Sequence, residues 1–436
     1  MPRQQATVSL LLLFCTDLTH SMELYYSFSV LIVLASFFSY INLRVLKLPS
    51  TIGVMIIAMF SSILLVIGGH LFPKFFSHFS TLLMDVDFTE VLMGAMLNFL
   101  LFAGAIHINL KDLREQKWPI VVFSTVSVLI STFVIGAILY YVFNVLHIDL
   151  PFIYCLLFGA LISPTDPIAV MGILKKANVR KSLETKVAGE SLFNDGVAVV
   201  VFSVILQLAQ GTDIDMSLGN ISWLLVKEAL GGFVLGALLG LGASNAIRKI
   251  DDYNVTVLIT LSVVMGGYLI AHTLHMSGPL TMVAAGIVIG NYGKRTAMSA
   301  TTKDYLNKFW ELIDEIMNAI LFLFIGFELL LIRDLNSYWL MGGIAILVVL
   351  LARFISIWIP VRLIPFRNKF SNGTIKILVW GGLRGGVSIA LALSIDNGPY
   401  KQPIIAITYF VVVFSIVVQG LSIGKVANKV LSKEEV

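Results

Sequence analysis

The sequence carries little charge for its length. Only 13% of its 436 residues are Asp, Glu, Lys or Arg, whereas about a quarter of a soluble globular protein is charged. Apolar residues make up 58% of the chain, and the mean hydropathy is +0.91. Apolar stretches recur from end to end that are long enough to cross the ~30 Å hydrocarbon core of a bilayer. This composition excludes a soluble protein and predicts an all-α polytopic membrane protein.

Cysteine and clustered basic charge are also scarce. The two cysteines, Cys15 and Cys155, are too few for a disulfide framework, and both lie in apolar sequence. The net charge of +4 comes from basic residues scattered over short loops, so we expect no nucleic-acid partner. The sequence contains no Cys/His cluster of the kind that binds a transition metal. We predict no cofactor and no enzymatic activity.

The hydropathy pattern predicts about thirteen transmembrane helices. They form one transmembrane domain at 24–428, preceded by an N-terminal extension at 1–23 and followed by a cytoplasmic tail at 429–436. Met22 is an alternative to Met1 as the start of the chain. The predicted spans are 24–43, 51–72, 90–108, 119–147, 152–175, 186–210, 221–248, 255–273, 279–293, 305–331, 338–364, 373–396 and 403–428.

The distribution of Lys and Arg over the loops supports this count. When the loops are taken alternately, one set holds 23 of the 30 Lys and Arg residues and the other set holds five. Cytoplasmic loops are enriched in Lys and Arg, and a missed helix would have mixed the two sets. The sequence therefore predicts a multi-pass inner-membrane protein with its N-terminus outside and its C-terminus in the cytoplasm.

Two predicted spans contain interruptions. The fifth carries Ser163-Pro164-Thr165-Asp166-Pro167, and the twelfth carries Gly381-Gly382-Leu383-Arg384-Gly385-Gly386. Each proline removes a backbone donor and clashes with the preceding turn, so we expect the fifth helix to unwind. Four glycines and an arginine interrupt the twelfth at a comparable depth, and we expect this helix to be discontinuous too. The two lie seven spans apart, which reverses their orientation. This predicts two inverted six-helix repeats, about 24–210 and 255–428, joined by a connecting helix at 221–248, with the site at the broken helices.

The sixth span concentrates polar side chains on a single helical turn. Ser191 and Asp195 are four residues apart and share one face, while Glu190 and Asn194 share the neighbouring face. Hard monovalent cations prefer oxygen ligands, and backbone carbonyls freed at Thr165-Asp166 are able to complete such a shell. We predict Asp195 as the carboxylate shared by proton and cation, Asp166, Thr165 and Ser191 as Na⁺ or Li⁺ ligands, and Asn194 as an orienting residue.

A buried aspartate is suited to hold a proton or a cation, but not both. Desolvation favours the protonated form, whereas a bound cation favours the carboxylate. Competition for one site, combined with alternating access, is sufficient for exchange. Asp166 has an alternative role, which is to offset the amide ends of its broken helix.

Two arginines lie inside predicted spans and need partners, because arginine does not lose its charge. We expect Arg353 to pair with Glu190, and Arg384 to compensate the carbonyl ends of the broken helix. The swapped assignment stays open.

The three motifs, Ser163–Pro167, Gly189-Glu190-Ser191-Leu192-Phe193-Asn194-Asp195-Gly196 and Gly381-Gly382-Leu383-Arg384-Gly385-Gly386-Val387, resemble the sodium/proton exchangers of the NhaP/NHE type in order and spacing. The resemblance implies a homodimer, an elevator-like movement of a core subdomain, and, from the Asn194-Asp195 pair, electroneutral exchange. It also implies that Asp195 is the transport carboxylate, that Asp166 and Ser191 line the site, and that Glu190 and Arg353 form a stabilising pair. One departure is Ala103, where prokaryotic relatives often carry a glutamate.

The predicted function is antiport of Na⁺ or Li⁺ against H⁺, with a role in pH homeostasis. K⁺/H⁺ antiport on the same scaffold is an alternative, because its ligands would be of the same type. A channel is disfavoured by the absence of a repeated filter motif. Symport of an organic anion at Arg384 is disfavoured by the acidic cluster nearby.

Overall fold

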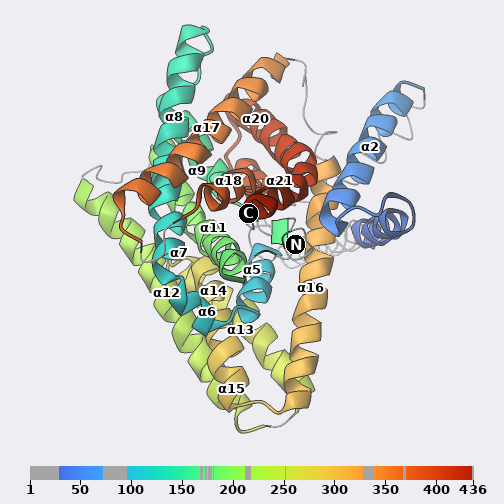
Figure 1. Cartoon of the computed structure of the whole chain (residues 1–436), viewed down its shortest axis with the longest axis vertical. Coiled ribbons are helices and arrows are strands. Elements are labelled where there is room, and N and C mark those ends of the chain that lie inside the picture. Colours follow the sequence, from blue (N-terminus) through green and yellow to red (C-terminus); the bar gives the residue numbers. More distant parts are fainter. Residues whose placement is uncertain are drawn as a thin grey trace, which may run out of the picture. The chain divides into compact units, whose positions relative to one another are not determined.

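The computed structural model describes residues 29–71, 96–166, 170, 171, 174, 179, 181–211, 218–250, 252–327, 337–366 and 370–434. Within these ranges the regular structure is entirely helical (Figure 1), which confirms the predicted all-α class. The predicted extension at 1–23 and Pro167 lie outside the described residues.

The described helices are spread over both halves of the chain. In the first half they are η1 (Asn42–Leu46), α2 (Ser50–Leu71), α5 (Leu97–Ile106), α6 (Leu110–Glu115), α7 (Lys117–Ser124), α8 (Val126–Val145), α9 (Phe152–Ile162) and α11 (Lys181–Ala209). In the second half they are α12 (Leu218–Ile247), α13 (Tyr253–Thr273), α14 (Gly278–Val288), η3 (Ile289–Gly293), α15 (Lys294–Thr296), α16 (Ala300–Phe327), α17 (Trp339–Leu363), α18 (Asn372–Trp380), α19 (Gly386–Leu393), α20 (Lys401–Phe414), η6 (Ser415–Gln419) and α21 (Gly420–Glu434).

Many of these helices are suited to a bilayer. Among the described residues, seven helices are long and apolar enough to cross a membrane. Shorter apolar helices at Ser50–Leu65, Leu97–Ile106 and Phe152–Ile162 accompany them. The multi-pass architecture follows from these segments, whereas the count of thirteen stays a prediction. The seven helices are Ser29–Leu46, Lys117–Val145, Lys181–Ala209, Ser222–Ile247, Tyr253–Thr273, Trp339–Leu363 and Lys401–Val430.

The chain forms two compact units. The first comprises Met1–Val91 and Ala319–Leu331. Its described part joins α2 to the end of α16, where Gly326 allows close approach because a Cβ there would overlap the Ala58 side chain. The Ser62 hydroxyl donates to the Gly326 carbonyl at 2.9 Å, so backbone packing and a buried hydrogen bond hold the two helices together.

The second unit comprises Leu92–Asn318 and Ile332–Val436. Within it α12 runs along α14, α8 packs against both α9 and α17, and α5 packs against α14 (Figure 1). Small residues make these contacts close: a Cβ on Gly159 would overlap the Thr132 carbonyl, and one on Gly236 would overlap the Thr281 carbonyl. Such contacts are how membrane helices gain packing energy without a hydrophobic drive.

Both predicted helix breaks are present in the second unit. Helix α9 ends at Ile162, and Ser163 to Asp166 continue without helical structure. Helix α18 ends at Trp380, and α19 begins again at Gly386 after an irregular stretch at 382–385. Unwound backbone at membrane depth requires protein or water around it, so the surroundings of these two breaks define where function is expected.

Candidate functional site

The two helix breaks are hydrogen-bonded to each other. The backbone N–H of Asp166 donates to the carbonyl of Leu383 at 2.7 Å. This bond satisfies one donor and one acceptor that unwinding had released. The interruptions at 163–166 and 381–385 therefore form one structural unit, although more than two hundred residues separate them in the sequence.

Arg384 is the centre of this unit. It is 1% exposed, and its Nη1 donates to the carbonyls of both Ser163 and Pro164, the latter at 2.9 Å. These carbonyls lie at the C-terminal end of α9, where the helix dipole is negative, so the guanidinium compensates both charge and hydrogen bonding there. Within the described ranges Arg384 forms no ion pair with Glu190.

The last membrane-spanning segment supports the second break through a π-helical turn. The backbone N–H of Arg384 donates to the Ser415 hydroxyl at 2.9 Å, and Ser415 in turn donates to Gln419 at 2.9 Å. The Gln419 amide donates to the Trp380 carbonyl at 3.1 Å. Both Ser415 and Gln419 lie in η6, and π-helical turns are frequent at functional sites. Their four-residue spacing was the one sequence signal for this support.

Thr165 connects the first break to α11. The Ser191 hydroxyl donates to the Thr165 carbonyl, and the Asn194 amide donates to the Thr165 hydroxyl at 2.9 Å. The Asn194 oxygen also accepts from the Thr165 N–H at 3.5 Å. Three predicted site residues are thus brought together, with Asn194 fixing the orientation of Thr165.

Asp166 and Asp195 extend the same cluster with two carboxylates. Both are half-buried, and they are close enough to repel each other electrostatically. Gly385 leaves room for Asp166, because a Cβ there would overlap its carboxylate. Within the described part of the chain, no Lys, Arg or His lies within ion-pair distance of Asp195. A proton or a cation is therefore the available means of neutralising it.

Glu190 precedes Ser191 on α11, but its carboxylate is neutralised differently from that of Asp195. Its Oε1 accepts from Nη1 of Arg353 on α17 at 2.6 Å, and the side chains of Glu190 and Arg353 are 2% and 7% exposed. Arg353 also donates to the Leu378 carbonyl at 3.0 Å, near the end of α18. A Cβ on Gly382 would overlap this guanidinium, so the second break also makes room for the ion pair.

Asp314 is not among the site residues predicted from the sequence. Its half-buried carboxylate on α16 is within electrostatic range of Asp166 and accepts a hydrogen bond from the Asn318 amide at 3.1 Å. Asp314 and Asn318 are four residues apart, which is the spacing of neighbours on one helical face. The surroundings of the break are thus acidic on a second side.

The oxygen atoms of the cluster are of the type that binds hard monovalent cations. Two carboxylates, a threonine hydroxyl and a backbone carbonyl come together at Asp166, Asp195 and Thr165. Across the described residues, no set of three His, Cys, Asp or Glu side chains is close enough to hold a metal ion. Ala103 on α5, the one departure from the family motifs noted in the sequence, is fully buried, and the neighbouring Gly104 faces Leu192 of α11.

Two discontinuous helices that meet inside a helical membrane bundle beside half-buried carboxylates are characteristic of secondary transporters, which carry ions and do no covalent chemistry. The comparisons with known proteins agree. The transmembrane profile of the sodium/hydrogen exchanger family matches residues 32–429. The chain therefore belongs to the sodium/hydrogen exchanger family, as its three motifs predicted.

Named relatives make the relationship more specific. The chain is 49% identical to the Na(+)/H(+) antiporter NhaP of Pseudomonas aeruginosa over 409 residues, which cover 92% of this chain and 95% of that protein. It is 34% identical to the Na(+)/H(+) antiporter NhaH of Halobacillus aidingensis, over 88% of this chain and 93% of that protein. The fold is similar to that of the sodium proton antiporter MjNhaP1 from Methanocaldococcus jannaschii, with a TM-score of 0.75 at 23% identity, over 94% of this chain and 99% of that one.

Proposed function

We propose that this protein exchanges Na⁺ or Li⁺ for H⁺ across the inner membrane. The observation that carries the proposal is a half-buried Asp195 with no basic partner among the described residues, next to the oxygen-rich break at Thr165 and Asp166. The antiporter names of relatives 34–49% identical over most of the chain support the same activity.

Competition at Asp195 is the proposed coupling step. Two neighbouring carboxylates do not both stay charged in a poorly solvated site unless a cation lies between them. Na⁺ binding displaces the proton from Asp195, and a proton binds again when Na⁺ leaves. The two carboxylates of the site are therefore never both charged without a cation. One proton for one monovalent cation makes the cycle electroneutral, in keeping with Asn194 rather than an acid at the preceding position.

The charges around the site favour cations over anions. Asp166, Asp195 and Asp314 form an acidic surrounding, while Arg384 already donates to two backbone carbonyls of the first break. These carboxylates would repel an organic anion more strongly than the Arg384 guanidinium would attract it. The same oxygen ligands also accept K⁺. K⁺/H⁺ antiport is therefore the second candidate function.

Movement of a core subdomain, in a homodimer, is the proposed means of alternating access. The hydrogen bonds that join the two breaks to each other and to α11 support a site that moves as one body. A rigid site must be exposed to each side in turn by displacement of the whole element that carries it. The positive-inside distribution of Lys and Arg favours a cytoplasmic C-terminus.

The test is an ion-resolved exchange assay. Purified protein in sealed proteoliposomes with an acid interior is given Na⁺, Li⁺ or K⁺ outside, and the pH gradient is followed with an entrapped dye. We expect rapid proton release with Na⁺ and Li⁺, at rates that do not depend on an imposed membrane potential. A response to K⁺ alone would favour the second candidate, and no response to Na⁺ or Li⁺ by either the wild type or Asp195→Glu would refute Na⁺/H⁺ exchange.

A further inference from the structure

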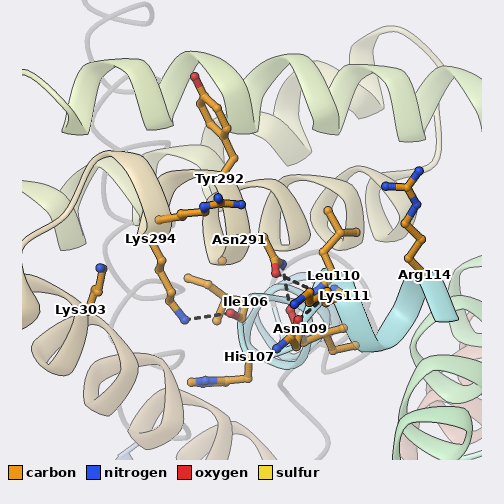
Figure 2. Close-up of a pocket in the computed structure, with 13 residues that line it drawn as sticks. Ile106, His107, Asn109, Leu110, Lys111, Arg114, Asn291, Tyr292, Lys294 and Lys303 are labelled. Atoms are coloured by element: carbon orange, nitrogen blue, oxygen red, sulfur yellow. Dashed lines mark hydrogen bonds between the residues drawn. The ribbon is translucent and has the colours of Figure 1, made fainter. Parts of the chain in front are cut away.

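A cavity in the second unit has the opposite charge from the proposed transport site. It has a volume of about 720 Å³ and lies where the turn between α5 and α6 meets η3 and α15 (Figure 2). Its basic lining residues are His107, Lys111, Arg114, Lys294, Arg295 and Lys303. No Asp or Glu contributes to the lining within the described residues.

The walls of this cavity are held in place by hydrogen bonds between distant segments. The Asn291 side chain accepts from the Leu110 N–H at 2.7 Å and donates to the Ile108 carbonyl at 2.8 Å. Lys294 Nζ donates to the Ile106 carbonyl at 2.9 Å, as Figure 2 shows. Gly290 permits the contact, because a Cβ there would overlap the Ile106 carbonyl. The cavity is therefore a built feature of the fold and not a gap between loose loops.

Four of the basic side chains in the cavity have no acidic partner among the described residues. Two acidic residues that neighbour the lining in the sequence are paired elsewhere: Asp112 with Lys181 at 3.3 Å, and Asp304 with Lys308 at 2.8 Å. Across the described ranges, Lys111, Arg114, Arg295 and Lys303 form no ion pair. In addition, burial lowers the pKa of Lys294 to about 8, a cost that a bound anion would offset.

We propose that this cavity binds a phosphate-bearing anion, supplied by the headgroup of an anionic phospholipid. Several Lys and Arg side chains around one concave site are the chemistry that recognises phosphate, and clusters of this kind at the cytoplasmic ends of membrane helices select anionic lipids. Ile106, Ile108 and Leu110 add apolar wall beside the cations, which suits a lipid better than a free anion. Both lining loops belong to the Lys- and Arg-rich set predicted to face the cytoplasm.

The experiment measures binding to the purified full-length protein in a neutral detergent. The probe is fluorescent phosphatidylglycerol, followed by anisotropy, with phosphatidylcholine of the same chains and label for comparison and inorganic phosphate as a soluble competitor. The cavity variant is Lys111→Gln/Arg114→Gln/Arg295→Gln, and all three residues are exposed, so the fold should persist. The control is Arg248→Gln/Lys249→Gln/Lys376→Gln, which removes the same charge from exposed positions outside the cavity.

We expect the wild type to bind phosphatidylglycerol at least tenfold more tightly than phosphatidylcholine. The cavity variant should lose about tenfold or more in affinity for phosphatidylglycerol, and the control less than threefold. Displacement of the labelled lipid by millimolar inorganic phosphate would support a phosphate site whose natural source is the soluble anion. Equal binding of the two lipids, or equal losses in the two variants, would overturn the proposal. Because no transport is measured, the result is independent of the ion that the protein exchanges.

Discussion

Asp166 donates its backbone N–H to the carbonyl of Leu383 at 2.7 Å, so the two interrupted helices of this exchanger-family protein are joined at the point where each loses its helical structure. The bond lies between a residue that follows α9 and one that precedes α19. Helix α11 adds Ser191 and Asn194 from the side through Thr165. The proposed transport site is consequently built on backbone that three separate helices hold in place.

Neutralising Asp195 is expected to abolish exchange while the protein still folds. Asp195→Asn keeps the shape of the side chain but removes the charge that proton and cation share. We expect at least a hundredfold loss of Na⁺-driven proton release in proteoliposomes, with an unchanged elution volume in size-exclusion chromatography. Asp149→Asn, at an exposed position before α9, is the control and should retain full exchange. Exchange retained by Asp195→Asn would refute the proposed site.

Breaking the buried pair between Glu190 and Arg353 is expected to destabilise the protein rather than alter its ion preference. Glu190→Gln leaves a buried guanidinium without a counter-charge, which costs about 3–5 kcal/mol. The double variant Glu190→Gln/Arg353→Met should recover a large part of that loss. The measurement is the free energy of unfolding in detergent. A double variant as unstable as the sum of its two single variants would contradict a direct pairing.

Arg384 is expected not to tolerate lysine. Both bonds come from Nη1, which lies one atom farther along the side chain than lysine Nζ, so an ammonium group at this position does not reach the carbonyls of both Ser163 and Pro164. Losing one charge-assisted bond should cost roughly 1.5–3 kcal/mol of stability, measured by denaturant unfolding. Lys at the exposed position Arg362 should cost much less. Equal stability of Arg384→Lys and the wild type would show that the second bond contributes nothing.

Gly385 is expected to control cation affinity through Asp166. A methyl group at Gly385 would overlap the Asp166 carboxylate and force it to move. We expect Gly385→Ala to raise the apparent KM for Na⁺ about tenfold, equivalent to about 1.4 kcal/mol. Gly343→Ala on α17 adds the same methyl group in open space and serves as the control. An unchanged KM in both variants would indicate that the position of Asp166 does not affect binding.

Lys294 is expected to give the protein a pH-dependent stability. Its pKa in the folded protein, about 8, is below the ordinary value of 10.5. Between these two pH values the unfolded chain binds more protons than the folded one, so folding becomes more favourable as pH rises. The stability of the wild type relative to Lys294→Met should therefore be constant below about pH 7.5 and increase from about pH 8 to 10.

The measurement for Lys294 is thermal unfolding in neutral detergent without phosphate or anionic lipid, at half-unit steps of pH. Lys249→Met, at an exposed position, is the control and should follow the wild type throughout. A stability difference for Lys294→Met that does not change with pH would refute the effect of burial on this lysine.

The elements of the fold were predictable where one segment determines its own structure. Proline has no N–H and clashes with the preceding turn, so the closely spaced Pro164 and Pro167 predict a break in their helix from local sequence alone. Residues four apart on a helix share a face, so Ser191 and Asp195 are neighbours in any packing. The all-helical class, the two breaks and the polar turn on α11 all follow from such local rules. The inverted repeat and the roles of the site residues stay predictions.

What the sequence determined by itself is therefore local: membrane helices, their interruptions and the groups on each helical turn. Only the tertiary structure decided which partners those groups have, namely Leu383 for Asp166, the first-break carbonyls for Arg384, and η6 for the backbone of the second break. The basic cavity also depends on the tertiary structure, because its two walls are about 180 residues apart in the chain. The physical reason is that hydrogen bonds and charges act over a few ångströms, and the crossing of distant helices sets those distances.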